Sequence, residues 1–187
     1  MKIIETRLPG VVIIEPKLFH DGRGFFMETW HQGRYTEAGL SMNFVQDNVS
    51  FSTKGVLRGL HFQHPNPQGK LVTVLQGEVF DVAVDIRVGS PTFGQWTGTL
   101  LSSGNGRQMV IPEGFAHGFC ITSQTALFTY KCTAFYAPQS ERTLLWNDPD
   151  IGIAWPIEAP ILSEKDVDAP RLIAIDQDRL PRFTMGS

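Results

Sequence analysis

The stretch Lys70–Arg87 reads KLVTVLQGEVFDVAVDIR, and it decides the fold class. Gln76-Gly77 separates two apolar runs in the way that a hairpin turn separates two strands. After this turn the side chains alternate with a period of two residues, which predicts a strand with two different faces. One of these faces carries Val79, Asp81, Ala83 and Asp85.

Working outward from this hairpin, apolar segments that end in turn sequences predict further strands. They are Val11–Glu15, Gly94–Leu101, Arg107–Ile111, Phe115–Ile121 and Ala126–Phe135. Two segments only, Arg34–Leu40 and Ala169–Asp178, have helical character. Many short strands at regular spacing predict a mainly β protein with a few short helices, built as an antiparallel sandwich or jelly roll. Without a linker or a repeat before about Pro156, the chain is expected to form one domain over residues 1–187, with a core of about 3–170 and a tail of 171–187.

The composition is that of an ordinary globular protein: 187 residues, of which 42% are hydrophobic and 19% charged. The net charge of −3 argues against a nucleic-acid partner. No apolar run approaches the roughly 20 residues of a membrane span. Glu5, Arg7 and Pro9 interrupt the N-terminal apolar residues, so we expect a cytoplasmic protein without a secretion signal. Cys120 and Cys132 are expected to be reduced thiols packed in strands.

Two histidines stand in glycine-bounded apolar strands, His61 in GVLRGLHFQH and His117 in IPEGFAHGF. In a small β-barrel such positions can point into the mouth, where ligands bind. The alternative is a pair of structural histidines in the core or on the surface. If alternation holds, Asp81 faces the interior and needs a partner, for which His117 is a candidate.

These motifs resemble the cupins, which are double-stranded β-helices of the jelly-roll type. Gly55 to His61 is similar to the start of the first cupin motif, and the pattern Pro112-x-Gly114-x-x-His117 matches the centre of the second. Metal-binding cupins have a second histidine where this chain has Gln63, followed by a glutamate that is missing here. His64 is out of step by one residue, which reverses the face of a strand. We therefore expect a cupin-type barrel that has lost its metal.

A finer resemblance covers residues from about Ile3 to Pro170. The segments EPKLFHDGRGFFMETW, VLRGLHFQ, GEVFDVAVDIR, IPEGFAHGF, YKCTAFYAP and LSEKDVDAP, among others, resemble in order the dTDP-4-dehydrorhamnose 3,5-epimerase family. The resemblance implies conversion of dTDP-4-keto-6-deoxy-glucose to dTDP-4-keto-rhamnose in the route to dTDP-L-rhamnose. It also implies that the protein uses neither metal nor organic cofactor and that it is a homodimer.

Epimerisation beside a ketone needs a base, a donor for the enolate oxygen and an acid. The resemblance makes His61 the base, which suits an imidazole because it titrates near neutral pH. It assigns Asp166, two residues before the similar Asp168, to orient the ring of His61. Tyr130 is then the acid, and Lys70 contacts the substrate near its keto group. Taken alone, Tyr130 and Lys70 would be a core tyrosine and a solvated strand-end lysine.

The resemblance also implies substrate-binding residues. Arginines beside glycines suit a diphosphate, polar side chains suit the base and the sugar, and a tyrosine can stack on a pyrimidine. In addition to Lys70, the set is Arg23, Glu28, Gln46, Asn48, Arg58, His117, Tyr136, Glu141 and Lys165. Arg23 and Glu28 belong to an N-terminal segment that commonly reaches the neighbouring subunit's pocket in this family. Each residue would otherwise be an ordinary surface residue.

Three other functions remain open at this point. A relative in another deoxysugar pathway would epimerise one carbon only or isomerise a 4-ketosugar, and its residues would be the same. A metal-dependent cupin oxygenase would hold stoichiometric metal. A non-catalytic module would bind the sugar nucleotide without turning it over.

Overall fold

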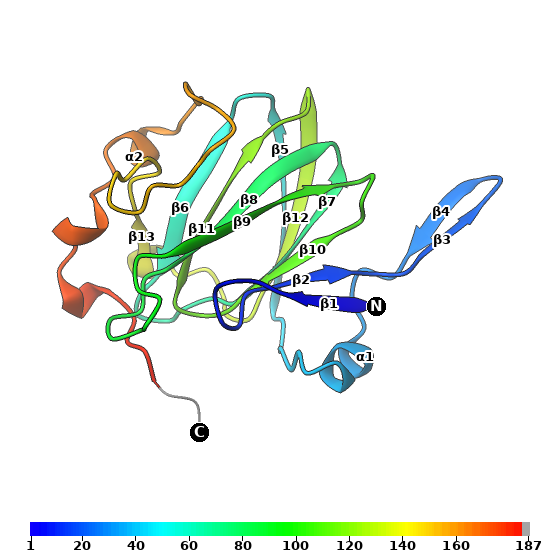
Figure 1. Ribbon diagram of the computed structural model, residues 1–187, viewed down its shortest axis with the longest axis horizontal. Coiled ribbons are helices and arrows are strands. Elements are labelled where there is room, and N and C mark those ends of the chain that lie inside the picture. The colour runs from blue at the N-terminus through cyan, green and yellow to red at the C-terminus, as the bar shows by residue number, and fades with distance from the viewer. Residues whose placement is uncertain (185–187) are drawn as a thin grey trace.

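The computed structural model describes residues 1–184 and consists mainly of two antiparallel β-sheets (Figure 1). The first sheet has six strands in the order β1-β2-β10-β7-β12-β5. Their bounds are Lys2–Glu5, Val12–Glu15, Gln108–Ile111, Lys70–Gln76, Thr125–Cys132 and Gln46–Thr53. The second sheet has the order β13-β6-β11-β8-β9. Its strands are Glu141–Thr143, Leu57–Gln63, Phe115–Ile121, Glu78–Asp85 and Trp96–Ser102.

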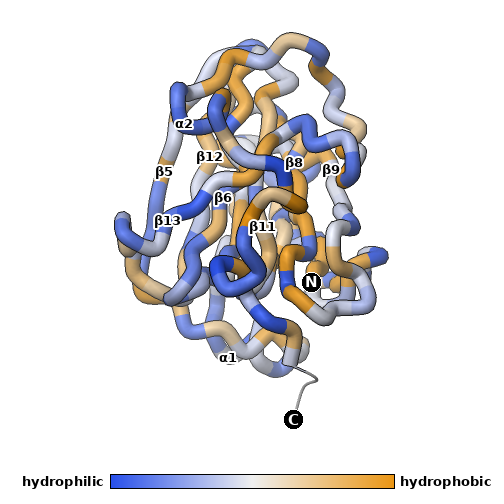
Figure 2. Tube along the Cα trace, turned by 90° about the vertical axis from the view of Figure 1, so that its left-hand side faces the viewer, coloured by the Kyte–Doolittle hydropathy of each residue, from blue (hydrophilic) through white to orange (hydrophobic). Residues whose placement is uncertain are grey.

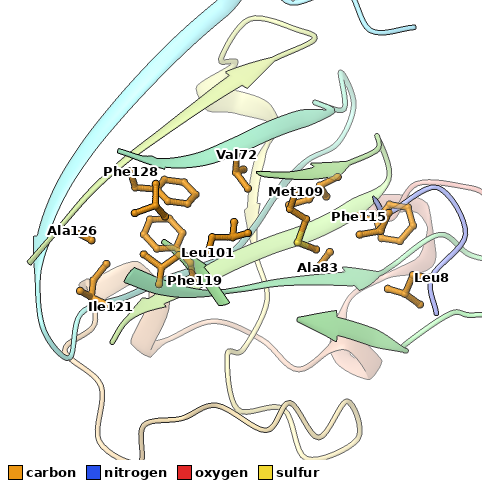
Figure 3. Packing of buried hydrophobic residues seen from close by; sticks show 14 residues of the cluster. Leu8, Val72, Ala83, Leu101, Met109, Phe115, Phe119, Ile121, Ala126 and Phe128 are labelled. Atoms are coloured by element: carbon orange, nitrogen blue, oxygen red, sulfur yellow. The ribbon is translucent and has the colours of Figure 1, made fainter. Parts of the chain in front are cut away.

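The main core lies between the two sheets (Figure 3). Alternate residues of each strand point inward, such as Val72 on β7, Phe128 on β12 and Phe119 on β11. The rings of Phe119 and Phe128 stack across the core with their centroids 4.0 Å apart. The interior of the barrel is therefore filled with side chains at this level, and any cavity has to open nearer to one end.

Apolar residues also cover the outer faces of both sheets. Residues after β13, among them Leu144, Ile151 and Leu172, pack on the outside of the five-stranded sheet. Tyr35 of the helix α1 (Gln32–Glu37) packs against the outer face of the six-stranded sheet. Figure 2 shows orange, hydrophobic residues along the central strands and blue, hydrophilic residues at α2 (Glu164–Val167). The C-terminal part of the chain thus belongs to the same packed unit as the barrel.

The β-rich architecture is confirmed, while the helical predictions need correction. Residues 34–40 were expected to be helical, and α1 lies at residues 32–37 instead. The helix expected at Ala169–Asp178 is wrong, because this segment forms two single 3₁₀ turns, Leu172–Ala174 and Gln177–Arg179. Leu172 is buried against the barrel, and this tertiary contact replaces a continuous helical stripe. The expected tail of 171–187 includes residues 185–187, which lie outside the described residues.

Several features were not predicted from the pattern of apolar residues, among them the short strands β1 and β13. The hairpin of β3 (Leu18–Asp21) and β4 (Gly24–Met27) extends away from both sheets in Figure 1. Strand β5 was missed because its inward residues are polar, as described below. Strand Ala126–Phe135 was expected to be longer than β12, which ends at Cys132. Within residues 1–184, no helix is both long and apolar enough to cross a membrane.

Candidate active site

A cavity of about 460 Å³ opens between the two sheets, and most of the predicted site residues line it. Strands of both sheets contribute, together with the segment that leads into α2. Among its lining residues are Arg58, His61, Lys70, His117, Tyr130, Glu141, Lys165 and Asp166. The fold therefore brings together predicted residues as distant in sequence as Arg58 and Asp166, which are 108 positions apart.

His61 and His117 lie directly opposite each other on the neighbouring strands β6 and β11. Because cross-strand partners share a face, both imidazoles point into the cavity. Arg58 lines the same cavity although it is three residues from His61, a spacing that normally places side chains on opposite faces. The register between β6 and β11 shifts between these residues, so a β-bulge turns Arg58 inward beside His61.

Glycines make this bulge possible. Gly59 has a φ of 123°, and a Cβ there would lie 2.6 Å from the Cα of Gly118. A Cβ at Gly118 would lie 2.9 Å from the backbone oxygen of Arg58. The two strands approach too closely at this point for any side chain.

His61 forms one His–Asp pair at the rim of the cavity. Its Nε2 lies 2.6 Å from Oδ1 of Asp166, and Ser163 donates to the other carboxylate oxygen at 2.7 Å. Burial opposes ionisation of Asp166, but the hydrogen bonds from His61 and Ser163 prevail and lower its pKa below the ordinary value. Because an ionised carboxylate only accepts, Nε2 of His61 carries the proton and Nδ1 is left as the basic atom.

His117 forms a second His–Asp pair deeper in the barrel, as the alternation of β8 predicted. Its Nε2 lies 3.0 Å from Oδ2 of Asp81, which is fully buried. Burial lowers the pKa of His117, although Asp81 acts against this shift. His117 also stacks with Phe128, with the ring centroids 6.2 Å apart, so that its ring is held by the core.

Tyr130 and Lys70 approach the cavity from the six-stranded sheet. The ammonium of Lys70 lies 5.7 Å from the centre of the Tyr130 ring. Burial lowers the pKa of Lys70 and raises the pKa of Tyr130. The phenol therefore stays protonated at neutral pH. Within residues 1–184, Lys70 has no carboxylate within ion-pair distance, so this cation is free to meet a ligand's negative charge.

A second, smaller hollow of about 270 Å³ continues from Tyr130 and is lined by Gln46, Asn48, Gln68 and Tyr136. Gln46 donates to Asn48 at 3.1 Å and accepts from the backbone N–H of Tyr136 at 2.8 Å. The exposed ring of Tyr136 stands at this opening. Polar groups and an aromatic ring are thus in place beside the larger cavity that contains His61.

Glu141 joins this hollow to the helix that carries Asp166. It accepts from the hydroxyl of Tyr136 at 3.1 Å and from Lys165 at 2.7 Å. Burial works against ionisation of Glu141, yet the bond from Lys165 leaves its pKa lowered. The predicted residues Tyr136, Glu141 and Lys165 therefore form one chain of contacts along the rim.

Strand β5 adds cavity residues that the sequence reasoning missed. Its inward side chains are Gln46, Asn48, Ser50 and Ser52, which pair across to β12 at Cys132, Tyr130, Phe128 and Ala126. Ser52 accepts from Nε of Arg58 at 3.1 Å. The hydroxyl of Ser50 is buried without a hydrogen-bond partner and lines the cavity. The period of two that starts at Gln46 and Asn48 could have indicated both serines.

Arg23 and Glu28 are not brought to this cavity by their own chain. Arg23 is exposed at the hairpin tip and pairs with Asp21 at 2.5 Å. Glu28 pairs with Arg34 and lines a larger hollow of about 720 Å³ between the hairpin and α1. None of the residues assigned to catalysis lines this hollow, so we place the candidate site in the smaller cavity.

The potential metal ligands of the cavity include two separate His–Asp pairs. Within residues 1–184, no group of three or more histidine, cysteine, aspartate or glutamate side chains is arranged to hold a metal ion. Gln63, at the position of the second cupin histidine, donates to the backbone oxygen of Asn66 and so takes part in a loop contact. Cys120 and Cys132 are free and buried, as predicted.

Comparison with known proteins gives consistent matches. A family model described as dTDP-4-dehydrorhamnose 3,5-epimerase matches residues 5–173. The chain is 56% identical over 178 residues to the protein of that name from Shigella flexneri, a match that covers 94% of this chain and 98% of the relative. It is 58% identical over 168 residues to the one from Neisseria gonorrhoeae, covering 89% of this chain. The match spans about half, 51%, of that longer relative.

Solved structures agree with these matches. A Legionella pneumophila epimerase in complex with dTDP-4-keto-L-rhamnose has a TM-score of 0.96 and 55% identity, covering 98% of this chain and 99% of that one. A 3'-monoepimerase from Streptomyces bikiniensis in complex with dTDP-quinovose has a TM-score of 0.88 and 32% identity, with 95% and 91% covered. The fold is therefore the cupin-type barrel that these epimerases share.

Proposed function

This chain belongs to the dTDP-4-dehydrorhamnose 3,5-epimerase family, and we propose that it epimerises carbons 3 and 5 of dTDP-4-dehydro-6-deoxy-D-glucose with His61 as base and Tyr130 as acid. The product is dTDP-4-dehydro-L-rhamnose, in the route to dTDP-L-rhamnose. The strongest support for this mechanism is that His61 and Tyr130 enter one cavity from opposite sheets. An epimerase needs this arrangement because the proton leaves one face of a carbon and returns to the other.

The reaction begins when Nδ1 of His61 takes a proton from the carbon next to the ketone. The pair of electrons left behind moves into the ring as an enolate, with negative charge on the oxygen of carbon 4. Asp166 holds Nε2–H and stabilises the imidazolium that forms, as the carboxylate of a His–Asp dyad does.

The enolate oxygen needs a positive or hydrogen-bonding partner. Lys70 supports this role because its ammonium reaches the cavity without a carboxylate in ion-pair contact within the described residues. His117 faces the same space from the paired strand. Together they lower the energy of the charged intermediate in a site partly shielded from water.

Tyr130 then donates its phenolic proton to the opposite face of the carbon. Its raised pKa keeps the proton available at neutral pH. The proton held by His61 is lost to solvent and Tyr130 is reprotonated, so the site is reset. The same two proton transfers at the second carbon, on the other side of the ketone, complete the double epimerisation.

The nucleotide half of the substrate extends along β5. Tyr136 stacks on the base, while Gln46, Asn48, Glu141 and Lys165 provide polar contacts to base and sugar. The guanidinium of Arg58 binds the diphosphate through bidentate hydrogen bonds. We propose a homodimer in which Arg23 and Glu28 complete the neighbouring site, because the hairpin that carries Arg23 at its tip and leads into Glu28 stands clear of its own barrel.

Metal and organic cofactors have no role in this proposal. The ketone already acidifies its neighbouring carbons, and both imidazoles are engaged by their own carboxylates. We also propose that residues 1–187 act as a single epimerase domain. This is supported by the contacts that join the C-terminal segment to the outer face of the barrel.

A coupled assay tests the proposal. The protein, dTDP-4-keto-6-deoxyglucose, a 4-ketoreductase and NADPH are combined, and we expect NADPH to be consumed only when the protein is present. Proton NMR in D₂O should show deuterium entering both carbon 3 and carbon 5. Exchange at a single carbon would instead support a monoepimerase, and absence of turnover would refute the proposal.

The His61→Ala variant tests the mechanism. We expect turnover to fall to background while dTDP binding, measured by calorimetry, stays within about threefold, because His61 is placed at the sugar and not at the nucleotide. Unchanged turnover in this variant would show that another group is the base.

A further inference from the structure

Ser163 precedes α2 at the position where a serine usually caps a helix. A capping serine accepts a hydrogen bond from a backbone amide of the first turn. The side chain of Ser163 makes no such bond. The amides of Asp166 and Val167 bond instead to the backbone oxygen of Ser163, at 3.0 and 3.1 Å. The Ser163 hydroxyl is therefore not needed to start the helix.

This hydroxyl donates to Oδ2 of Asp166 at 2.7 Å. The Asp166 side chain is 2% exposed, and its other oxygen lies 2.6 Å from His61. One donor thus holds each oxygen of a buried carboxylate. Two bonds in different directions fix the rotation of a carboxylate, which a single bond leaves free.

We propose that Ser163 is a positioning residue that orients Asp166 and so keeps the proton of His61 on Nε2. This inference rests on the proposed function, in which Nδ1 of His61 must be the free, basic nitrogen. Ser163 itself lines the cavity, but it acts through the carboxylate. The result is a Ser163–Asp166–His61 chain in which the serine is the outermost member and never receives the substrate's proton.

The test compares Ser163→Ala with Ser163→Thr, which keeps a hydroxyl. Ser41→Ala, at an exposed serine away from the cavity, is the matched control. In the alanine variant we expect kcat to fall about tenfold with KM within about twofold, since a misplaced base slows the chemical step more than binding. The threonine variant should recover most of this loss, and the melting temperature should not change.

The second measurement does not depend on activity. Long-range ¹H–¹⁵N NMR of histidine-labelled protein reports which nitrogen of His61 is protonated. We expect the Nε2–H form in the unmodified protein and in the threonine variant, and a mixture of both forms in the alanine variant. An unchanged tautomer in the alanine variant would overturn the inference, whatever happens to the rate. If the protein had no epimerase activity at all, the tautomer result would still decide the role of Ser163.

Discussion

The two His–Asp pairs are built from the same side chains in different surroundings. The His117–Asp81 pair joins neighbouring strands, and both partners are buried. The His61–Asp166 pair joins a strand to a short helix 105 residues away, and the imidazole is 25% exposed. Burial and the adjacent strands make the first pair a fixed part of the barrel. The second pair lies where a substrate can reach it.

This contrast indicates a division of roles. A buried pair holds its geometry because its polar atoms have no alternative partners. A pair at the rim keeps one imidazole nitrogen free for chemistry, but it needs a further hydrogen bond to fix its orientation. Ser163 donates that bond to Asp166. Catalytic use and structural use of the same pair are therefore separable by mutation.

The largest expected effect separates the pairs by activity. Asp166→Asn should lower kcat by roughly 10³–10⁴-fold, because the amide can hold the wrong tautomer of His61. Asp81→Asn should lower kcat less, because in the proposed mechanism His117 faces the enolate but does not take the substrate's proton. The coupled assay measures both. Equal losses would mean that both pairs take part in proton transfer.

The next effect separates the pairs by stability, in the opposite order. Asp81→Asn leaves polar atoms unpaired in the core, and we expect the free energy of unfolding to fall by about 1–3 kcal/mol. Asp166 is also buried, but its partner His61 is 25% exposed, so water can replace part of the lost contact and Asp166→Asn should cost less, about 1 kcal/mol. Urea denaturation gives both values. A larger loss at Asp166 would make the rim pair the structural one.

The smallest effect is a dependence of stability on pH. Burial, against the influence of Asp81, lowers the folded pKa of His117 from 6.5, so the unfolded chain binds its proton more readily. Stability should therefore rise with pH up to about 6.5 and then level off, with a slope of at most about 1.4 kcal/mol per pH unit from this residue. Lys70 and His61 also face this imidazole.

Asp166 should respond in a separate pH range. The bonds from His61 and Ser163 outweigh burial and lower its pKa from 3.8. The stability that the ionised Asp166 contributes is therefore retained above this pH and lost as the pH falls further.

The His117 prediction is checked by urea titrations of the unmodified protein and of His117→Gln between pH 5 and 7. Finding the same slope in both would contradict the assignment to His117.

The sequence alone could predict the strands in which one face is apolar. Strands β7, β8, β10 and β11 appear in it as alternating or continuous apolar residues, and Asp81 was placed correctly toward His117 by that alternation. Strand β5 could not be found in this way, because its inward face is polar and carries Gln46, Asn48 and Ser50. A search for apolar faces misses a strand whose inner face is polar.

The candidate site was predicted by resemblance and not by pattern. His61, Lys70, Tyr130 and Asp166 do line one cavity, yet no periodicity connects them. The position of Arg58 could not have come from period two, which turns it away from His61. Arg23 and Glu28, which the resemblance also assigned to the substrate, lie outside this cavity and pair with Asp21 and Arg34.

The bulge at Gly59 has a consequence for how this strand tolerates insertions and deletions. In a regular strand, deleting one residue turns every side chain beyond it to the opposite face. Here the odd spacing between Arg58 and His61 works only because one residue is unpaired. Deleting it would restore a regular ladder in which Arg58 and His61 are two positions apart and still share the inward face. A single-codon deletion at the bulge would thus leave the proposed diphosphate ligand and the proposed base facing the cavity, whereas the same deletion in a regular part of the strand would reverse the faces beyond it.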